Sequence, residues 1–112
     1  MPDTRKLVPE QLAPASANNL VEQQAAVIFD VREPHEFAEE HILGAQSLPV
    51  SALDPKQLPL GKTAILYCGA GRRSCGVAEQ LRQAGFDNVA TIEGGIVGWK
   101  QSGLPTDGEN PR

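Results

Sequence analysis

Short, almost continuous apolar runs separated by helix-like segments constrain the fold of this chain more than any other feature. Residues 27–31 (VIFDV) and 63–68 (TAILYC) show hardly any polar alternation, which is the pattern of strands buried on both faces of a parallel sheet. Residues 45–50 (AQSLPV) and 89–93 (VATIE) are expected to form two further strands, and residues 6–8 a short additional one. Parallel strands need long crossover connections, so helices are expected between the runs.

Helical segments are indeed expected in the gaps between these runs. The clearest covers residues 74–84, which has one apolar face and stops before Gly85. Residues 34–40 begin with a proline at a position that suits the first turn of a helix. Further helices are expected at residues 16–24, at 51–58 (a weak pattern) and at 95–101. The alternation of strand and helix predicts an α/β fold with helices on both faces of the sheet.

Composition narrows the function classes. A chain of 112 residues suits one domain, and a net charge of -4 argues against a nucleic-acid partner. No apolar run approaches the roughly 18 residues of a membrane-spanning helix, and the opening segment MPDTRKLVPEQLAP has no apolar stretch of signal-peptide type. A cytoplasmic location without membrane contact is therefore expected, and in that setting the two cysteines are expected to be thiols.

The segment ILYCGAGRRSC ends an apolar run on a cysteine and continues with glycines and arginines. Ligands of open parallel sheets bind beyond the carboxyl ends of the strands, and Cys68 is expected to be the last residue of such a strand. Gly69 and Gly71 would allow a tight loop that turns its N–H groups toward the sulfur, while the next helix would point its positive end at the same place. Arg72 and Arg73 add positive charge. These effects favour the thiolate, the nucleophilic form of cysteine.

Three segments resemble the signatures of the rhodanese (thiosulfate sulfurtransferase) domain. CGAGRRS, residues 68–74, is similar to the active-site loop of that family. FDVREPHEFAEEHILGAQSLP, residues 29–49, resembles its first signature, and IEGGIVGWKQSGLPT, residues 92–106, its closing signature. Their order and spacing are those of the family, so a rhodanese-like domain is expected over residues 5–106, with a polar tail at 107–112. The resemblance implies a five-stranded, mainly parallel sheet flanked by helices.

The same resemblance implies a function. Cys68 would take up a sulfane sulfur as a persulfide from a small anionic donor such as thiosulfate and pass it to cyanide, a thiol or a protein acceptor. The substrate would be bound by Gly69, Ala70, Gly71, Arg72 and Arg73. No cofactor is implied, and a monomer or weak dimer is expected. Two alternatives stay open at this point: a non-enzymatic sulfur-carrier or protein-interaction module, and a thiol redox or arsenate-handling enzyme that uses Cys68 with Cys75.

The length of the cysteine loop separates these activities from phosphatase chemistry. Phosphatases related to the family use a Cys-x5-Arg loop that fits a phosphate. In this chain the position six residues after Cys68 is occupied by Ser74, and the second arginine, Arg73, comes one position earlier. Phosphatase or arsenate reductase activity is therefore not expected, and Ser74 is expected to support the loop.

Several other residues are assigned structural roles. Asp30 and Arg32 end a strand, where a carboxylate orients loops by accepting backbone or arginine hydrogen bonds, and in the family this Asp-x-Arg pair lies near the active-site loop. His35 and His41 show no metal-ligand spacing with a cysteine, so no metal site is expected. Cys75 falls on the flank of its helix. It is interpreted as a small packing residue, with a relay thiol that accepts sulfur from Cys68 as the alternative.

Overall fold

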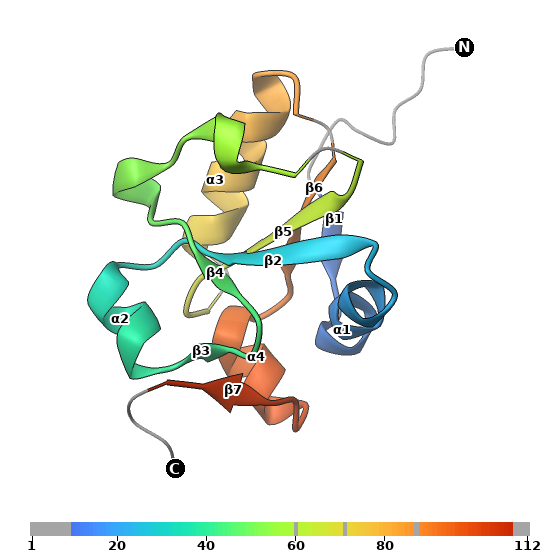
Figure 1. Cartoon of the computed structure of the whole chain (residues 1–112), viewed down its shortest axis with the longest axis vertical. Helices are drawn as coiled ribbons and strands as arrows, with labels where there is room; N and C mark the ends of the chain where they lie inside the picture. The colour runs from blue at the N-terminus through green and yellow to red at the C-terminus, as the bar shows by residue number, and fades with distance from the viewer. Residues whose placement is uncertain (1–9, 60, 71, 87, 109–112) are drawn as a thin grey trace.

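The computed structural model describes residues 10–59, 61–70, 72–86 and 88–108, and these form an α/β fold around a parallel sheet (Figure 1). Five strands lie in the order β1-β6-β5-β2-β4, all parallel to their neighbours. The two central strands, β2 and β5, pair over five residues, from Ala26 beside Thr63 to Asp30 beside Tyr67. The strands are β1 (Glu10–Leu12), β2 (Ala26–Asp30), β4 (Gln46–Ser47), β5 (Thr63–Tyr67) and β6 (Val89–Ile92).

Helices cover both faces of this sheet, as the sequence pattern predicts. In Figure 1, α3 (Arg72–Gln83) lies above the sheet, whereas α1 (Pro14–Glu22) and α4 (Gly95–Gln101) lie below it. The helix α2 (Pro34–Glu39) follows β2 directly and lies beside the carboxyl ends of the central strands. This arrangement leaves the loops after β2 and β5 side by side at one end of the sheet, where parallel α/β folds bind their ligands.

Some elements differ from the sequence-based expectations. The strand expected at residues 6–8 lies outside the described residues, and the edge strand that pairs with β6 is Glu10–Leu12, whose EQL sequence carries no strand pattern. Residues 51–58 do not form an α-helix. Pro49 and Pro55 interrupt this segment, which instead forms two short 3-10 turns. These turns are η1 (Val50–Ala52) and η2 (Pro55–Gln57).

A small antiparallel ribbon stands apart from the main sheet and was not predicted. It pairs β3 (His41–Ile42) with β7 (Thr106–Asp107). Glu40, immediately before β3, accepts hydrogen bonds from Lys100 and Thr106, at 2.8 Å each. Asp107 belongs to this ribbon, although it falls in the segment expected to be a polar tail. The end of the described chain is thereby fastened to the end of α2.

The sheet separates two apolar clusters. Leu66 of β5 packs with Phe29, Val77 and Leu81 on the α3 side, whereas Ile65 belongs to the cluster on the α1 and α4 side. Side chains alternate between the two faces of a strand, so successive residues of β5 contribute to different layers. The consequence for the site is that a residue and its neighbour in sequence face opposite sides of the sheet.

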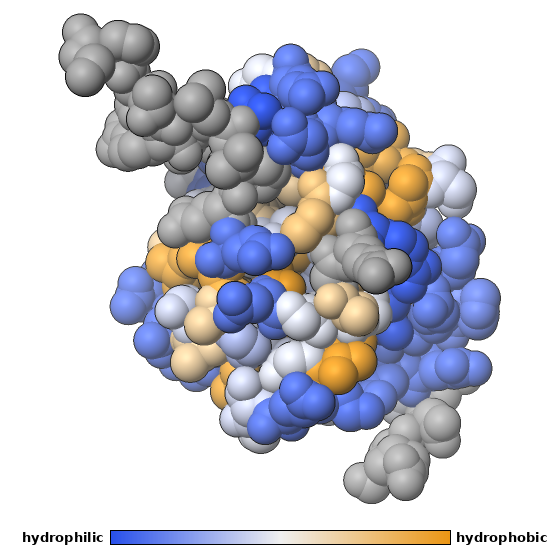
Figure 2. Space-filling view, turned by 180° about the vertical axis from the view of Figure 1, so that it is seen from behind, coloured by the Kyte–Doolittle hydropathy of each residue, from blue (hydrophilic) through white to orange (hydrophobic). Residues whose placement is uncertain are grey.

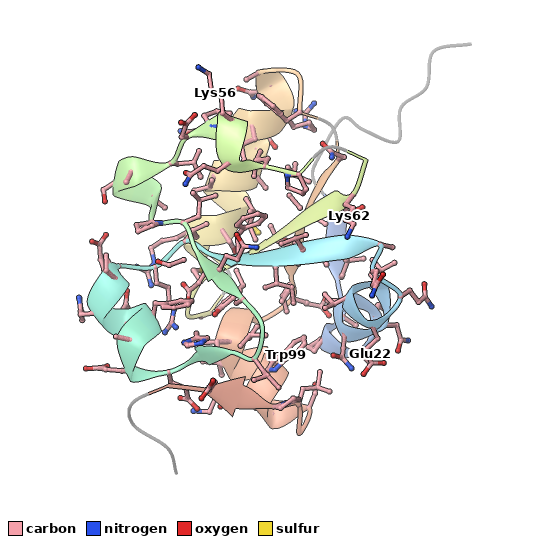
Figure 3. All side chains as sticks on the ribbon, viewed as in Figure 1. Glu22, Lys56, Lys62 and Trp99 are labelled. Carbon is pink, nitrogen blue, oxygen red and sulfur yellow. The ribbon has the colours of Figure 1, made fainter. Side chains whose placement is uncertain are left out.

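Figure 2 shows the described residues on the side of the molecule opposite to that of Figure 1. Hydrophilic residues cover most of this face, and hydrophobic ones are scattered in separate spots (Figure 2). The largest aromatic side chain, Trp99 of α4, is buried below the sheet (Figure 3) and donates a hydrogen bond to the carbonyl of Pro105 at 2.8 Å. None of the helices in the described part of the chain has the length and apolar character needed to cross a bilayer.

Candidate active site

Cys68 lies one residue beyond the end of β5 and begins the loop that leads to α3. It was expected to be the last residue of the strand, but the ladder ends with the carbonyl of Tyr67, which accepts the N–H of Val31 at 3.0 Å. The carbonyl of Cys68 turns away and accepts the N–H of Ile96 at 2.9 Å. The side chain of Cys68 is only 2% exposed and packs in the α3-side cluster with Val77.

The first turn of α4 donates two backbone hydrogen bonds to the cysteine loop. The N–H of Ile96 donates to Cys68 and the N–H of Val97 donates to the carbonyl of Gly69 at 3.1 Å. N–H groups in the first turn of a helix have no partner within the helix, so the loop satisfies them. A trans peptide places its N–H opposite to its carbonyl. The N–H groups of Gly69 and Ala70 therefore point away from α4, to the side on which the Cys68 side chain lies.

Gly95 makes this close approach possible. A Cβ at this position would overlap the carbonyl oxygen of Cys68 and would lie 2.6 Å from the carbonyl oxygen of Gly69. Its φ of +60° also belongs to the left-handed region, which favours glycine. The closing signature of the sequence thus contributes directly to the shape of the cysteine loop, a role that the sequence analysis did not assign to it.

Arg73 is the arginine that the structure places against the loop. Its guanidinium lies beside Gly69, where an added Cβ would be 3.8 Å from Nη2, and its Nη1 pairs with Glu36 Oε1 at 3.4 Å. The hydrogen bond to Glu36 raises the pKa of Arg73, whereas burial lowers it. The interaction with Cys68 also raises the pKa of Arg73. Arg73 therefore stays charged between a carboxylate and the sulfur.

The remaining predicted loop residues have different surroundings. Ala70 is exposed, and Ser74 is fully buried on α3. Gly71 lies outside the described residues, and of Arg72 only the backbone, which begins α3, is described. Their assignments as substrate-binding or supporting residues stay predictions.

Asp30 and Arg32 form a buried ion pair on the face of the sheet opposite to Cys68. The guanidinium binds both carboxylate oxygens, with Nη2 at 2.7 Å and Nε at 3.0 and 3.1 Å. Tyr67 donates its hydroxyl to Asp30 at 2.7 Å and accepts the N–H of Ile42 at 2.9 Å. Burial, and then the charge of Asp30, raise the pKa of Tyr67, so its phenol stays protonated and donates.

This ion pair is also connected to the cysteine loop through α2. Arg32 also donates to two backbone carbonyls of α2: that of Glu36 in the first turn, at 3.4 Å, and that of Glu40, which caps the C-terminal end. The side chain of Glu36 pairs with Arg73, so a shift of α2 would also move the guanidinium that lies beside the cysteine loop. Asp30 and Arg32 thus lie where they can support the site without touching the sulfur.

Glu36 and Tyr67 are site residues that the sequence analysis missed. Glu36 had a readable signal, because Glu33 and Glu36 form a capping box at the start of α2. Tyr67 had none, since its contact with Asp30 depends on the register between β2 and β5.

Cys75 has neighbours different from those of Cys68. Its sulfur accepts a hydrogen bond from Nε2 of Gln11 in β1 at 3.2 Å and lies 3.9 Å from the hydroxyl of Thr91 in β6. Neither cysteine forms a disulfide. Cys75 therefore faces the β1–β6 edge of the sheet, whereas Cys68 packs with residues of β2 and β5. Across the described ranges, no group of three or more His, Cys, Asp or Glu side chains is arranged to hold a metal ion.

Comparison with known proteins identifies the class that this fold and loop define. A family model described as rhodanese-like domain matches residues 13–102, so the chain belongs to the rhodanese-like domain family. A rhodanese-related protein from Thermoplasma volcanium has a similar structure, with a TM-score of 0.78 and 31% identity, covering 88% of this chain and 97% of that one.

Two curated relatives are similar to this chain in sequence, and one of them is named for an activity. The chain is 32% identical over 101 residues to thiosulfate sulfurtransferase GlpE of Actinobacillus pleuropneumoniae, covering 87% of this chain and 92% of the relative. It is 50% identical over 97 residues to an uncharacterized protein of Synechocystis, covering 85% of this chain. The chain spans only 54% of the length of that second relative. Relatives named as sulfurtransferases thus support a sulfurtransferase family.

Proposed function

We propose that this chain is a sulfurtransferase that carries a sulfane sulfur as a persulfide on Cys68. The observation that carries the proposal is the pair of hydrogen bonds from Ile96 and Val97 to the carbonyls of Cys68 and Gly69. These bonds turn the following N–H groups of the loop to the side of the sulfur. Consecutive N–H groups in a tight loop form a concavity that binds anions, and a persulfide is an anion with a single terminal sulfur.

The reaction has two half-reactions. The Cys68 thiolate attacks the outer sulfur of thiosulfate, the S–S bond of the donor breaks, and sulfite leaves with the electron pair. Cyanide or a thiolate then attacks the terminal sulfur of the persulfide, the bond to the Cys68 sulfur breaks, and the Cys68 thiolate is regenerated. Arg73 attracts the anionic donor and offsets the charge that accumulates near the loop. No cofactor is required for either step.

The surroundings of two side chains support sulfur transfer over the alternatives. Phosphate and arsenate need an arginine that forks across two oxygens, but the position six residues after Cys68, where such an arginine would stand, holds the buried Ser74. A Cys68–Cys75 redox pair would need the two sulfurs to meet, whereas Cys75 bonds to Gln11 of β1, at the edge of the sheet. A sulfur carrier without turnover would form the same persulfide, so only kinetics separates it from an enzyme.

Intact mass after thiosulfate treatment without reductant tests the proposal. The expected result is a gain of one sulfur atom that is lost on addition of cyanide, with thiocyanate formed over many turnovers. Cys68→Ser should abolish both, and Cys75→Ser should leave both unchanged. Loading of Cys68→Ser would overturn the assignment of the nucleophile. Loading without repeated turnover would make the chain a carrier, and loss of transfer in a folded Cys75→Ser protein would make Cys75 a relay.

A further inference from the structure

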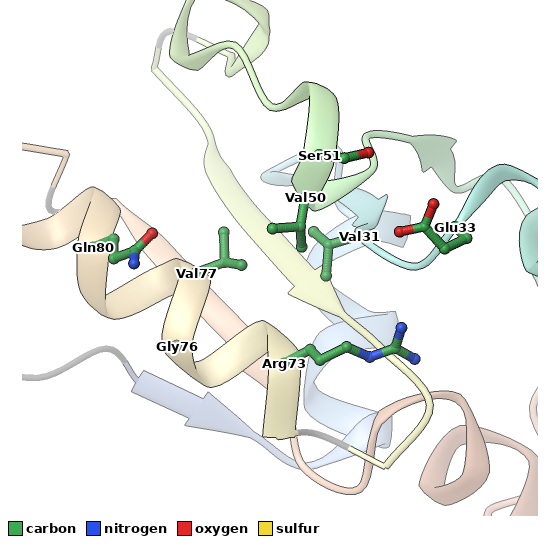
Figure 4. A pocket seen from close by; sticks show the side chains of 8 residues that line it. All are labelled: Val31, Glu33, Val50, Ser51, Arg73, Gly76, Val77 and Gln80. Carbon is green, nitrogen blue, oxygen red and sulfur yellow. The ribbon is translucent and has the colours of Figure 1, made fainter.

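The groups that would hold an anion at this site are placed by different helices. The first turn of α4 donates the hydrogen bonds that shape the cysteine loop. Arg73 instead extends from α3 to one end of a cleft, where Glu33 at the start of α2 also lies (Figure 4), and it pairs with Glu36 of α2. The distance between the loop and the guanidinium therefore depends on how α2 and α4 are placed relative to each other.

Glu40 joins the C-terminal ends of these two helices. It caps α2, and its Oε1 accepts a hydrogen bond from Nζ of Lys100 in the last turn of α4 at 2.8 Å. Its Oε2 accepts the hydroxyl of Thr106 in β7 at 2.8 Å. The backbone of Glu40 is bonded as well, because its N–H donates to the carbonyl of Glu36 at 3.1 Å and its carbonyl accepts from Arg32. One residue thus connects α2 with α4, with β7 and with the loop after β2.

The bridge between Glu40 and Lys100 is charged but not deeply buried. Hydrogen bonds from Lys100 and then from Thr106 lower the pKa of Glu40 and outweigh burial, so its side chain is a carboxylate at neutral pH. The side chains of Glu40 and Lys100 are 27% and 48% exposed, and ion pairs with such exposure contribute little to the stability of a protein. The bridge is therefore expected to act on the geometry of the site more than on the stability of the fold.

We propose that Glu40 is a positioning residue for sulfur transfer, which fixes α2 against α4 and thereby holds the Arg73 guanidinium beside the N–H groups of the cysteine loop. When the bridge is broken, α2 shifts, Glu36 shifts with it, and the ion pair draws Arg73 away from the loop. An anionic donor then meets the N–H groups of the loop without the guanidinium. The inference rests on the proposed sulfur transfer and adds a residue that acts on it from outside the loop.

Single-turnover loading of Cys68 at a series of thiosulfate concentrations, followed by intact mass, tests the inference. Glu40→Gln keeps the size of the side chain and one oxygen acceptor but removes the charge and the second acceptor. It should raise the half-saturating thiosulfate concentration by about three- to tenfold, which is part of what one hydrogen bond to a charged group contributes, with little change in the maximal loading rate. A smaller loaded fraction with an unchanged half-saturating concentration would mean that Glu40 serves the fold alone and would overturn the inference.

Lys100→Gln separates positioning from net charge. It breaks the same bridge from the side of α4, so the half-saturating concentration should rise here too. Glu40→Gln and Lys100→Gln change the net charge in opposite directions, so a general attraction of the dianionic donor would move the two values in opposite directions and would overturn the inference. Glu79→Gln is the control, because it breaks an ion pair with Arg82 that lies within α3. It should leave the half-saturating concentration unchanged.

A double substitution tests the route through Glu36. In a Glu36→Gln background Arg73 no longer follows α2, so adding Glu40→Gln should have no further effect on the half-saturating concentration. A rise of the same size with and without the Glu36 carboxylate would show that the effect does not pass through Arg73. That result would overturn the inference while leaving the proposed function intact. Failure of the wild type to take up sulfur on Cys68 would overturn both.

Discussion

Gly95 and Cys68 lie so close together that the carbonyl oxygen of Cys68 fills the space a side chain on Gly95 would need. Gly95→Ala is therefore expected to push the cysteine loop away from α4 and to break its hydrogen bonds to Ile96 and Val97. We expect sulfur transfer to fall by about 100- to 1,000-fold, since losing a preorganised donor has effects of this size. The free energy of unfolding should fall by about 1–3 kcal/mol, as in other overpacked sites.

Gly103→Ala provides the control for backbone strain. Gly103 has a similar positive φ of +78°, but nothing lies within 4 Å of the Cβ it would gain. The control should lose stability without losing transfer per folded molecule. If both variants reduce sulfur transfer per folded molecule to the same extent, Gly95 has no specific role in shaping the loop.

Glu36 competes with an anionic donor for Arg73. The pair is partly exposed, and exposed ion pairs contribute about 0.2–1 kcal/mol. Glu36→Gln should therefore raise kcat/KM for thiosulfate by about two- to fivefold at low salt, and the gain should disappear at about 1 M salt, where charges are screened over about 3 Å. Glu79→Gln removes a carboxylate that pairs with Arg82 elsewhere on α3. It should leave kcat/KM unchanged, and an equal gain there would point to net charge instead.

The same carboxylate predicts a pH dependence of stability. Burial alone would raise the pKa of Glu36, but its hydrogen bond from the N–H of Glu33 and its pairing with Arg73 lower it below the ordinary value of 4.5. A lowered pKa in the folded state contributes stability that is present above the ordinary value and is lost as the pH falls through the lowered value. Urea midpoints of the wild type and Glu36→Gln should therefore differ at neutral pH and converge in acid. A constant difference would contradict this linkage.

Asp30→Ala should destabilise the protein strongly. Arg32 would remain buried without its carboxylate, and removing one partner of a buried ion pair costs about 3–5 kcal/mol. Tyr67→Phe should cost about 1–3 kcal/mol, because the buried N–H of Ile42 loses its acceptor. Transfer should also fall in Asp30→Ala, through displacement of α2 and Glu36. Urea denaturation and transfer rates measure both effects, and abolished transfer with unchanged stability would assign Asp30 a direct role in the chemistry.

Apolar periodicity was sufficient to predict the central architecture. The apolar runs that gave β2, β5 and β6 are buried on both faces, and such runs are distinctive because a parallel sheet leaves no polar side. The helix α4 was predicted with its observed bounds. By contrast, β1 is a polar edge strand whose pairing depends on the neighbouring β6, and no local pattern reports that.

The site was predictable only in part, because some of its contacts depend on local sequence and others on tertiary packing. The position of Cys68 after a buried strand follows from local sequence, and so does the turn chemistry around it. The contact between Asp30 and Tyr67 depends on strand register, and the hold of Gly95 on the loop depends on how α4 packs. These are tertiary relationships between residues more than 25 positions apart, as the sequence numbers show.

The dependence of the cysteine loop on α4 also sets when the site is completed during synthesis. Chains emerge from the ribosome with the N-terminal part first, so Cys68 leaves the tunnel before Gly95, Ile96 and Val97. Until these residues dock, nothing fixes the carbonyls of Cys68 and Gly69, and the N–H groups of the loop are not aligned. A nascent or truncated chain is therefore expected to lack the aligned N–H groups of the loop. Under the proposed function, the sulfur-binding loop is complete only after α4 has been synthesised.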